Sequence, residues 1–344
     1  MKRRVSRGRG AASRPCAAAL RVVAIALATT VVSCGPAADD GSIELKLGHV
    51  GAPGSLFDLA AVEFARRVEE RSGGSVTVAT FGSSQLGGDE TLLQKIKLGT
   101  VDIALPSTVM SSMIDEFGLF EMPYIVDDRE HMKRIEEAVV WPDLVPIAEA
   151  DGYRILAVWE NGFRHITNNE RPIASPADLE GIKLRTPRGV WRVKLFQALG
   201  ANPTPMAYSE VFMALQTGVM DGQENPFAQI HSGRLHEVQK YLSLTAHVYT
   251  PAFFVVGVNR WDRMPAEVQT VVAETAREMQ DYVYETAVRL EEEYLADMQA
   301  AGIVVNEADH DAFLAASQSV YDEFAATVDG GDALISKARA TADR

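Results

Sequence analysis

One uninterrupted helical pattern occupies residues 265–302, which read PAEVQTVVAETAREMQDYVYETAVRLEEEYLADMQAAG. Pro265 suits a first helical position and Gly302 suits a helix stop. Apolar or small residues recur between them at helical spacing, at Val268, Val271, Val272, Thr275, Met279, Tyr282, Val283, Leu290, Tyr294 and Met298. At ~1.5 Å per residue this helix would be roughly 54 Å long, more than the ~30 Å of a small domain. We therefore expect one helix that packs against two lobes. A coiled coil is the weaker alternative, because the spacing drifts and the sequence holds no second long helix.

The sequence before this helix alternates strand and helix patterns. We expect strands at 43–48, 76–81 and 101–105, with helices at 55–71 and 90–98 between them. Strands that alternate with helices in this way are typical of a parallel sheet covered by helices.

The middle of the chain predicts a second unit of the same kind. Residues 117–128 show little periodicity and are expected to form an irregular crossing, followed by a helix at 129–150 and a buried strand at 153–160. The second unit is expected to contain a strand at 182–185, helices at 189–199 and 209–217, and an extended segment at 221–226. The apolar run at 247–259 could cross from one lobe to the other, and a final helix is expected at about 311–328.

Length and composition favour a soluble protein of two domains. The chain has 344 residues, which is long for a single core, and its apolar and charged fractions of 47% and 23% are ordinary for a globular protein.

The N-terminus has the pattern of a secretory signal. Seven basic residues and no acidic residue precede Cys34, and the apolar run 22–32 is too short to span a membrane. Residues 31–35 (VVSCG) resemble a bacterial lipobox, so we expect Cys34 to be acylated at the new N-terminus, while an ordinary cleaved signal remains the alternative. Cys16 falls inside the expected signal at 1–33, and residues 34–42 read as a polar tether. The mature chain is therefore expected to have no disulfide.

Charge argues against polyanionic partners. Removal of residues 1–33 takes 7 of the 33 basic groups and none of the 47 acidic groups, which leaves a net charge of −21. Nucleic acid is not expected as a partner, and the membrane is expected to be contacted only through the lipid anchor.

Signatures of catalysis and of cofactor binding are mostly missing. The sequence has no Gly-x-Ser-x-Gly elbow, phosphate loop or His-Glu-x-x-His motif, and its histidines are scattered, so we expect no enzyme activity, no metal and no cofactor. The acidic run 291–293 is more simply a solvated helix face.

Three polar residues stand in unusually specific phrases between Gly162 and Pro226. Arg164 lies in Gly-Phe-Arg, Arg185 in Lys-Leu-Arg-Thr-Pro, and Asn225 in Asp-Gly-Gln-Glu-Asn-Pro. A guanidinium presents five donors in a planar fork that fits a carboxylate with two hydrogen bonds, so these residues could hold a small organic acid. A surface salt bridge is the alternative for any one arginine alone.

The phrases from 162 to 241 closely resemble the solute-binding proteins of tripartite ATP-independent periplasmic (TRAP) transporters, of the dicarboxylate or organic-acid-binding type. The match includes GANPTPMAYSEV at 200–211, ALQTG at 214–218 and DGQENP at 221–226, while SQLGGD at 84–89 and GTVDI at 99–103 match the amino-terminal half. The resemblance covers about residues 43 to 330.

The resemblance implies a ligand site. Arg185 is expected to clamp a ligand carboxylate, Arg164 and Asn225 to complete the anchor, and Tyr208 to pack on the ligand. Arg188 stands where members vary with their ligand, and a solvent-facing charge is its alternative. The weaker candidates for the walls of the site are Asp89, Ser107, Trp191 and His49, and Trp191 could equally be core.

The resemblance also implies an α/β, two-lobed periplasmic-binding-protein fold, with crossing hinge strands and a long helix that spans both lobes. Lobe I is expected at 43–161 with 251–290, lobe II at 162–250 with 291–330, and a C-terminal tail at 331–344. Arg164, Arg185 and Asn225 would then belong to lobe II.

The function implied is capture of an organic acid in the periplasm for ion-gradient-driven uptake by separate small and large TRAP membrane subunits. Sugar acids, four-carbon diacids and oxo acids all remain open as ligands. A ligand-sensing partner of a signalling receptor and a periplasmic sugar-acid enzyme are the rival hypotheses.

Overall fold

The computed structural model describes residues 42–342. The expected signal at 1–33, nearly all of the tether and the candidate lipidation site Cys34 lie outside them. None of the helices within 42–342 combines the length and the apolar character needed to cross a membrane.

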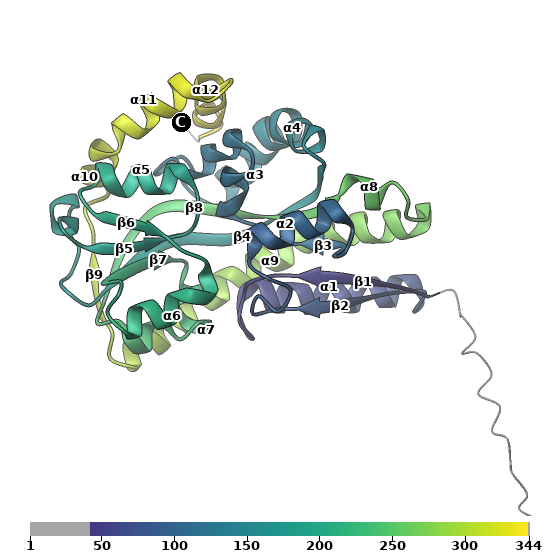
Figure 1. Ribbon diagram of the computed structural model, residues 1–344, viewed down its shortest axis with the longest axis horizontal. Coiled ribbons are helices and arrows are strands. Elements are labelled where there is room, and N and C mark those ends of the chain that lie inside the picture. Colours follow the sequence, from purple (N-terminus) through teal and green to yellow (C-terminus); the bar gives the residue numbers. More distant parts are fainter. Residues whose placement is uncertain (1–41, 343–344) are drawn as a thin grey trace, which may run out of the picture. The chain divides into compact units, whose positions relative to one another are not determined.

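Helices and strands alternate along this part of the chain (Figure 1). The amino-terminal elements are β1 (Ile43–Gly48), α1 (Leu56–Ser72), β2 (Val76–Phe81), α2 (Asp89–Leu98), β3 (Ile103–Ala104), α3 (Arg129–Ile135) and α4 (Val145–Ala150), with 3-10 turns η1 (Thr108–Ser112) and η2 (Asp115–Glu121) and a π-helical segment η3 (Glu136–Leu144). The central elements are β4 (Tyr153–Asn168), β5 (Lys183–Thr186), α5 (Val190–Ala198), β6 (Asn202–Pro205), α6 (Tyr208–Gln216), β7 (Gly222–Asn225), α7 (Phe227–Ser232) and β8 (Tyr241–Gly257). The chain ends with α8 (Val258–Trp261), α9 (Ala266–Ala300), β9 (Val304–Glu307), α10 (His310–Ala316), α11 (Gln318–Thr327) and α12 (Gly331–Ala340).

The described strands form one mixed sheet in the order β2-β1-β3-β8-β4-β7-β5-β6, with β9 paired to β8. Strand β1 runs parallel to β2 and β3, and β5 runs parallel to β6 and β7. The two parallel groups are joined by β4 and β8, which are antiparallel to each other and to their neighbours β7 and β3. The prediction of a parallel sheet is therefore correct within each group of strands, and it is wrong where the antiparallel strands β4 and β8 connect the two groups.

Strands β4 and β8 are long because they cross from one parallel group to the other. They contain 16 and 17 residues and stay paired from Tyr153 with Gly257 to Asn168 with Tyr241. Their register shifts three times, once between Glu160 and Gly162. Gly162 has φ = 116°, a conformation that strains residues with a side chain.

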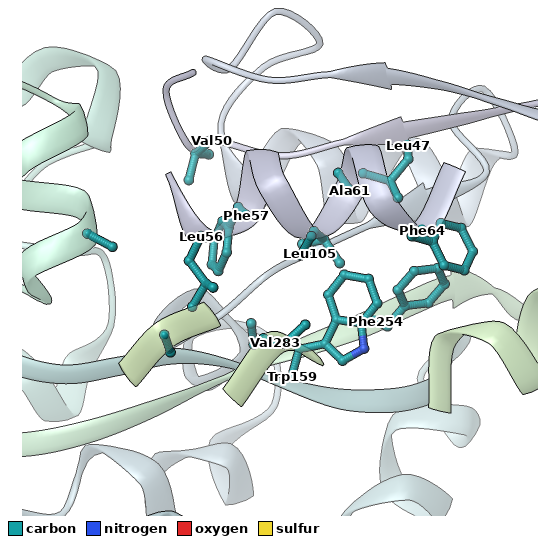
Figure 2. Close-up of a cluster of buried hydrophobic side chains, with 14 of the residues drawn as sticks. Leu47, Val50, Leu56, Phe57, Ala61, Phe64, Leu105, Trp159, Phe254 and Val283 are labelled. Carbon is teal, nitrogen blue, oxygen red and sulfur yellow. The ribbon is translucent and has the colours of Figure 1, made fainter. Parts of the chain in front are cut away.

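Helix α9 is the expected long helix, and its 35 residues make it about 52 Å long at ~1.5 Å per residue. It packs against α1, β4 and α7, which belong to both groups of the sheet. Figure 2 shows part of this core, where Trp159 of β4 lies among Phe64, Phe254 and Val283. The Trp159 indole also donates a hydrogen bond of 2.8 Å to the carbonyl of Ala276 on α9, so the helix is fixed to the crossing strand. The expectation of one α/β fold with a helix that spans both lobes is confirmed.

The C-terminal region departs from expectation. The final helix is two helices, α10 and α11, and the segment predicted as a tail contains α12, in which Leu334 and Ile335 are buried. These side chains belong to the same core as Phe117, Phe120 and Trp191. Strands β6 and β9 and helix α7 were also not predicted, because each is short and carries little periodicity.

Candidate functional site

A cavity of about 180 Å³ lies at the carboxyl ends of parallel strands from both groups of the sheet. One side, here called the arginine wall, is formed by Arg164, Arg185, Tyr208 and Asn225. The second wall is formed by Val50, Phe57, Asp89, Glu90, Ser107 and Thr108, which follow β1 and β3 or begin α1 and α2. Because parallel strands end at the same edge of a sheet, this topology gathers residues that are far apart in the sequence.

Arg185 is the penultimate residue of β5 and is 2% exposed. Its Nε and Nη2 donate to the carbonyl oxygen of Met206, at 3.0 and 2.5 Å. No carboxylate within residues 42–342 forms an ion pair with it. Burial lowers the pKa of Arg185 to about 9, against the opposing effect of Glu224, so the side chain is still charged at neutral pH. Arg185 therefore brings a positive charge with spare donors to the cavity.

Arg164 also faces the cavity but is already engaged. Its Nε and Nη2 donate to the carboxylate of Glu224 at 2.5 and 3.0 Å, and Nη2 also reaches the Glu224 carbonyl at 2.7 Å. A further hydrogen bond of 3.0 Å runs from Nη2 to Oδ1 of Asn225. The pairing of β4 with β7 places these residues together, since His165 is aligned with Asn225. The structure thus holds Arg164 in one orientation, with much of its hydrogen-bonding capacity used.

Glu224 is the centre of a buried ionic network. Besides Arg164, it accepts from Arg192 Nη1 at 2.5 Å and contacts His247 Nε2 at 3.1 Å. Arg192 in turn lies 2.9 Å from Glu121, and both residues are at most 1% exposed. Burial alone would raise the pKa of Glu224, but Arg164 and Arg192 outweigh it and hold that pKa well below its usual range. Glu224 is therefore ionised and fixes two guanidinium groups.

Burial lowers the pKa of His247 to about 4, although Glu224 opposes the shift. The imidazole is therefore neutral at pH 7. Because the Glu224 carboxylate can only accept, Nε2 carries the proton, and Nδ1 accepts from the Thr245 hydroxyl at 2.8 Å. The histidine acts as a hydrogen-bond donor without adding a charge.

Arg188 connects the two walls at the rim of the cavity. Its Nη1 lies 3.0 Å from Oε2 of Glu90, and the two side chains are 50% and 35% exposed. Arg188 lines the cavity, but it is paired and half exposed.

Tyr208, Asn225 and Ser107 line the cavity with their polar groups partly satisfied. The Tyr208 hydroxyl donates to the carbonyl of Gln229 at 2.7 Å, which leaves the ring as its contribution to the wall. The Asn225 amide donates to Gln223 at 2.5 Å, and the Ser107 hydroxyl donates to the carbonyl of Pro251 at 2.8 Å.

Two expected wall residues do not line the cavity. Trp191 is 3% exposed and packs edge-to-face on Phe324 with ring centroids 5.0 Å apart, so it belongs to the core. His49 is 1% exposed and meets the Phe57 ring edge-to-face, with ring centroids 6.4 Å apart. Burial lowers the pKa of His49 to about 4, so this residue supports the wall as a neutral ring.

Several residues of the site were not predicted. Glu224 lies in the same Gln-Glu-Asn-Pro sequence from which Asn225 was predicted. An acidic residue directly before Asn-Pro could therefore have indicated Glu224 as a further residue of the site. Thr108, Asn161 and Gln229 line the cavity from segments that carry no distinctive spacing.

The family model for bacterial extracellular solute-binding protein, family 7 (DctP), matches residues 47–327. The chain belongs to this family.

Individual relatives extend this comparison. The 2,3-diketo-L-gulonate-binding periplasmic protein YiaO of Escherichia coli strain K12 is 31% identical over 294 residues, which cover 85% of this chain and 90% of the relative. The C4-dicarboxylate-binding periplasmic protein DctP of Rhodobacter capsulatus is 34% identical over 262 residues, 76% of this chain and 78% of the relative. An uncharacterized protein y4mM of Sinorhizobium fredii is 35% identical over 280 residues, 81% of this chain, and the chain spans only 52% of that relative's length.

A solved structure has the same fold. The sugar acid binding protein DctPAm from Advenella mimigardefordensis, in complex with galactonate, is 30% identical, with a TM-score of 0.84 over 88% of this chain and 99% of that one. The chain thus has the two-lobed fold of a TRAP solute-binding protein and belongs with proteins that bind small organic acids.

Proposed function

We propose that the protein captures a small organic acid by clamping its carboxylate on Arg185, and that Arg164 and Asn225 complete the anchor. The observation that carries this proposal is the state of Arg185, a buried guanidinium whose only protein acceptor in the described chain is one backbone carbonyl. A buried charge is costly unless it is paired, and an incoming carboxylate supplies the missing partner.

Arg164 supports this anchor from a fixed position. Glu224 and Asn225 hold its guanidinium in place, so little side-chain entropy is lost when an acid binds. Arg164 and Arg192 share the Glu224 carboxylate, whereas Arg185 forms no ion pair within residues 42–342 and is left to pair with the ligand. The ring of Tyr208 supplies an apolar surface beside this charge.

Closure of the lobes follows from the position of the cavity. The arginine wall belongs to our proposed lobe II (162–250 with 291–330) and the second wall to lobe I (43–161 with 251–290). A ligand that contacts both walls favours the closed state, because only contacts made in that state shift the equilibrium toward it. The register shift at Glu160 and Gly162 in β4 is our candidate for the hinge.

The protein is proposed to work outside the inner membrane, where it delivers its acid to separate TRAP membrane subunits for ion-gradient-driven uptake. Acylation of Cys34 would hold it at a membrane surface. As a binding protein for transport it releases the acid unchanged, which distinguishes it from an enzyme. Deletion of the protein abolishes uptake of the acid, which distinguishes it from a sensor.

A thermal-shift screen against a panel of aldonates, uronates, four-carbon diacids and oxo acids tests the function. A ligand that binds only the native state raises the melting temperature by mass action. We expect at least one acid to raise it in the wild type and the Arg185→Ala variant to lose that response. An unchanged response in the variant, or no response to any acid in the wild type, contradicts the proposal.

A further inference from the structure

The cavity contains both free donors and unmatched acceptors. The free donors belong to the arginine wall, where Arg185 keeps N–H groups that no hydrogen bond in the described chain uses. Three buried atoms that line the cavity and can accept a hydrogen bond also have no partner in the described part of the chain, namely Oδ1 of Asp89, Oγ1 of Thr108 and Oε1 of Gln229. Thr108 and Gln229 are 8% and 3% exposed, so bulk water does not readily satisfy them. A buried acceptor without a donor is costly, which indicates that the ligand supplies donors here.

Asp89 is the charged member of this acceptor group. It is the first residue of α2, and Gly88 before it offers no side chain that could donate to it. Burial raises the pKa of Asp89 to about 7, although the attraction of Arg185 acts in the opposite direction. A carboxylate in this position gains most from an O–H group brought by the ligand, because hydrogen bonds to charged groups are the stronger ones.

The cations of the cavity leave no place for a second ligand carboxylate. Three arginines line the cavity in the described chain, and two of them already form ion pairs, Arg164 with Glu224 and Arg188 with Glu90. Of the three, Arg185 alone forms no ion pair within residues 42–342. A diacid that binds Arg185 with one end would bring a second negative charge into a cavity that Asp89 and Glu90 also line, and like charges repel.

We propose that the cavity selects a monocarboxylate whose remaining carbons carry hydroxyl groups, and that Asp89 is the residue that rejects diacids. Asp89, Thr108 and Gln229 accept hydrogen bonds from the hydroxyls while Arg185 holds the carboxylate. This inference rests on the proposed function, since it takes the clamp on Arg185 as given, and it commits to sugar acids of the aldonate kind over four-carbon or six-carbon diacids.

Two probes test the proposal because they differ at one carbon. D-galactonate ends in a CH₂OH group, and galactarate has the same carbon chain and the same hydroxyls on the inner carbons but ends in a second carboxylate. Their affinities are compared by calorimetry at pH 8, where Asp89 is ionised, on the wild type, on Asp89→Asn and on Asp115→Asn. Asp115 is exposed and away from the cavity, so its variant makes the same chemical change as a control.

The wild type is expected to bind galactonate at least tenfold more tightly than galactarate, since about 1.4 kcal/mol corresponds to a factor of ten. Asp89→Asn is expected to bring the two affinities within about threefold, because an amide can donate to a carboxylate and removes the repulsion. Asp115→Asn should keep the wild-type ratio. Equal or tighter binding of galactarate by the wild type, or an unchanged ratio in Asp89→Asn, overturns the proposal.

Failure of this inference is distinguishable from failure of the proposed function. If the wild type binds succinate through Arg185 and binds neither probe, the substrate class is wrong and the clamp stands. If no acid in the panel binds, or if Arg185→Ala binds as well as the wild type, the clamp itself is wrong.

Discussion

Replacement of Glu224 by glutamine should destabilise the protein strongly, because it removes the central charge of the buried network. The carboxylate holds Arg164 at 2.5 and 3.0 Å, Arg192 at 2.5 Å and His247 at 3.1 Å, and Glu224 is fully buried. Loss of one partner of a buried ion pair costs about 3–5 kcal/mol, since the other charge stays buried without compensation.

This cost can be converted to a melting temperature. The unfolding entropy of roughly 2.1 cal/mol/K per residue, taken over about 300 residues, is about 0.6 kcal/mol/K, so the midpoint should fall by about 5–8 °C. Thermal and urea unfolding followed by circular dichroism measure this change. Residual contacts of Arg164 with the Glu224 carbonyl and Asn225, and of Arg192 with Glu121, favour the lower part of the range.

Glu237→Gln provides the matched control. Glu237 forms two hydrogen bonds with Arg234 at 2.7 and 2.8 Å, but the two side chains are 41% and 69% exposed. Exposed pairs contribute little, so this variant should unfold at the wild-type midpoint. If Glu224→Gln proved no more destabilising than Glu237→Gln, the assignment of Glu224 as the anchor of the arginines would be refuted.

Two further perturbations follow from burial and backbone geometry. Burial raises the pKa of Glu121 to about 7, despite the attraction of Arg192, so the native state binds a proton that the unfolded state has lost above pH 4.5. The contribution of Glu121 to the free energy of unfolding of the wild type therefore falls as the pH rises from 4.5 to 7. Measured by urea unfolding, the stability of Glu121→Gln relative to the wild type should rise by up to about 1.4 kcal/mol per pH unit over this range. A stability difference that does not change with pH would contradict the raised pKa of Glu121. Gly162→Ala should lower the free energy of unfolding by about 1–3 kcal/mol, because φ = 116° strains an alanine and its Cβ would lie 3.3 Å from Glu160 Oε1. An unchanged unfolding midpoint would refute strain at this position.

The long-range architecture was predictable where a pattern was long or specific. The periodicity of 265–302 gave the extent of α9 to within two residues at each end, because a helix of that length repeats its apolar face many times. The apolar run at 247–259 indicated a crossing strand, but pairing with β4 extends β8 back to Tyr241. Partner strands set the length of a strand, and a single sequence does not show them.

Within the site, individual residues were easier to predict from the sequence than the contacts between them. Arg185 and Asn225 were predicted from their phrases, and both line the cavity. The role of Glu224 was missed because its partners Arg192 and His247 come from α5 and β8, which only the folded sheet brings together. Trp191 failed as a wall residue because helical spacing does not say which neighbour a buried aromatic ring faces.

The clamp on Arg185 is tested most directly by calorimetry of Arg185→Lys with the acid that gives the largest thermal shift. A lysine keeps the charge but lacks the planar fork, so we expect the affinity to fall by roughly 100-fold to 1,000-fold, which corresponds to about 3–4 kcal/mol and lies within the range for a broken buried pair. Arg234→Lys, at an exposed position outside the cavity, should bind like the wild type. An affinity of Arg185→Lys within twofold of the wild type would contradict the carboxylate clamp.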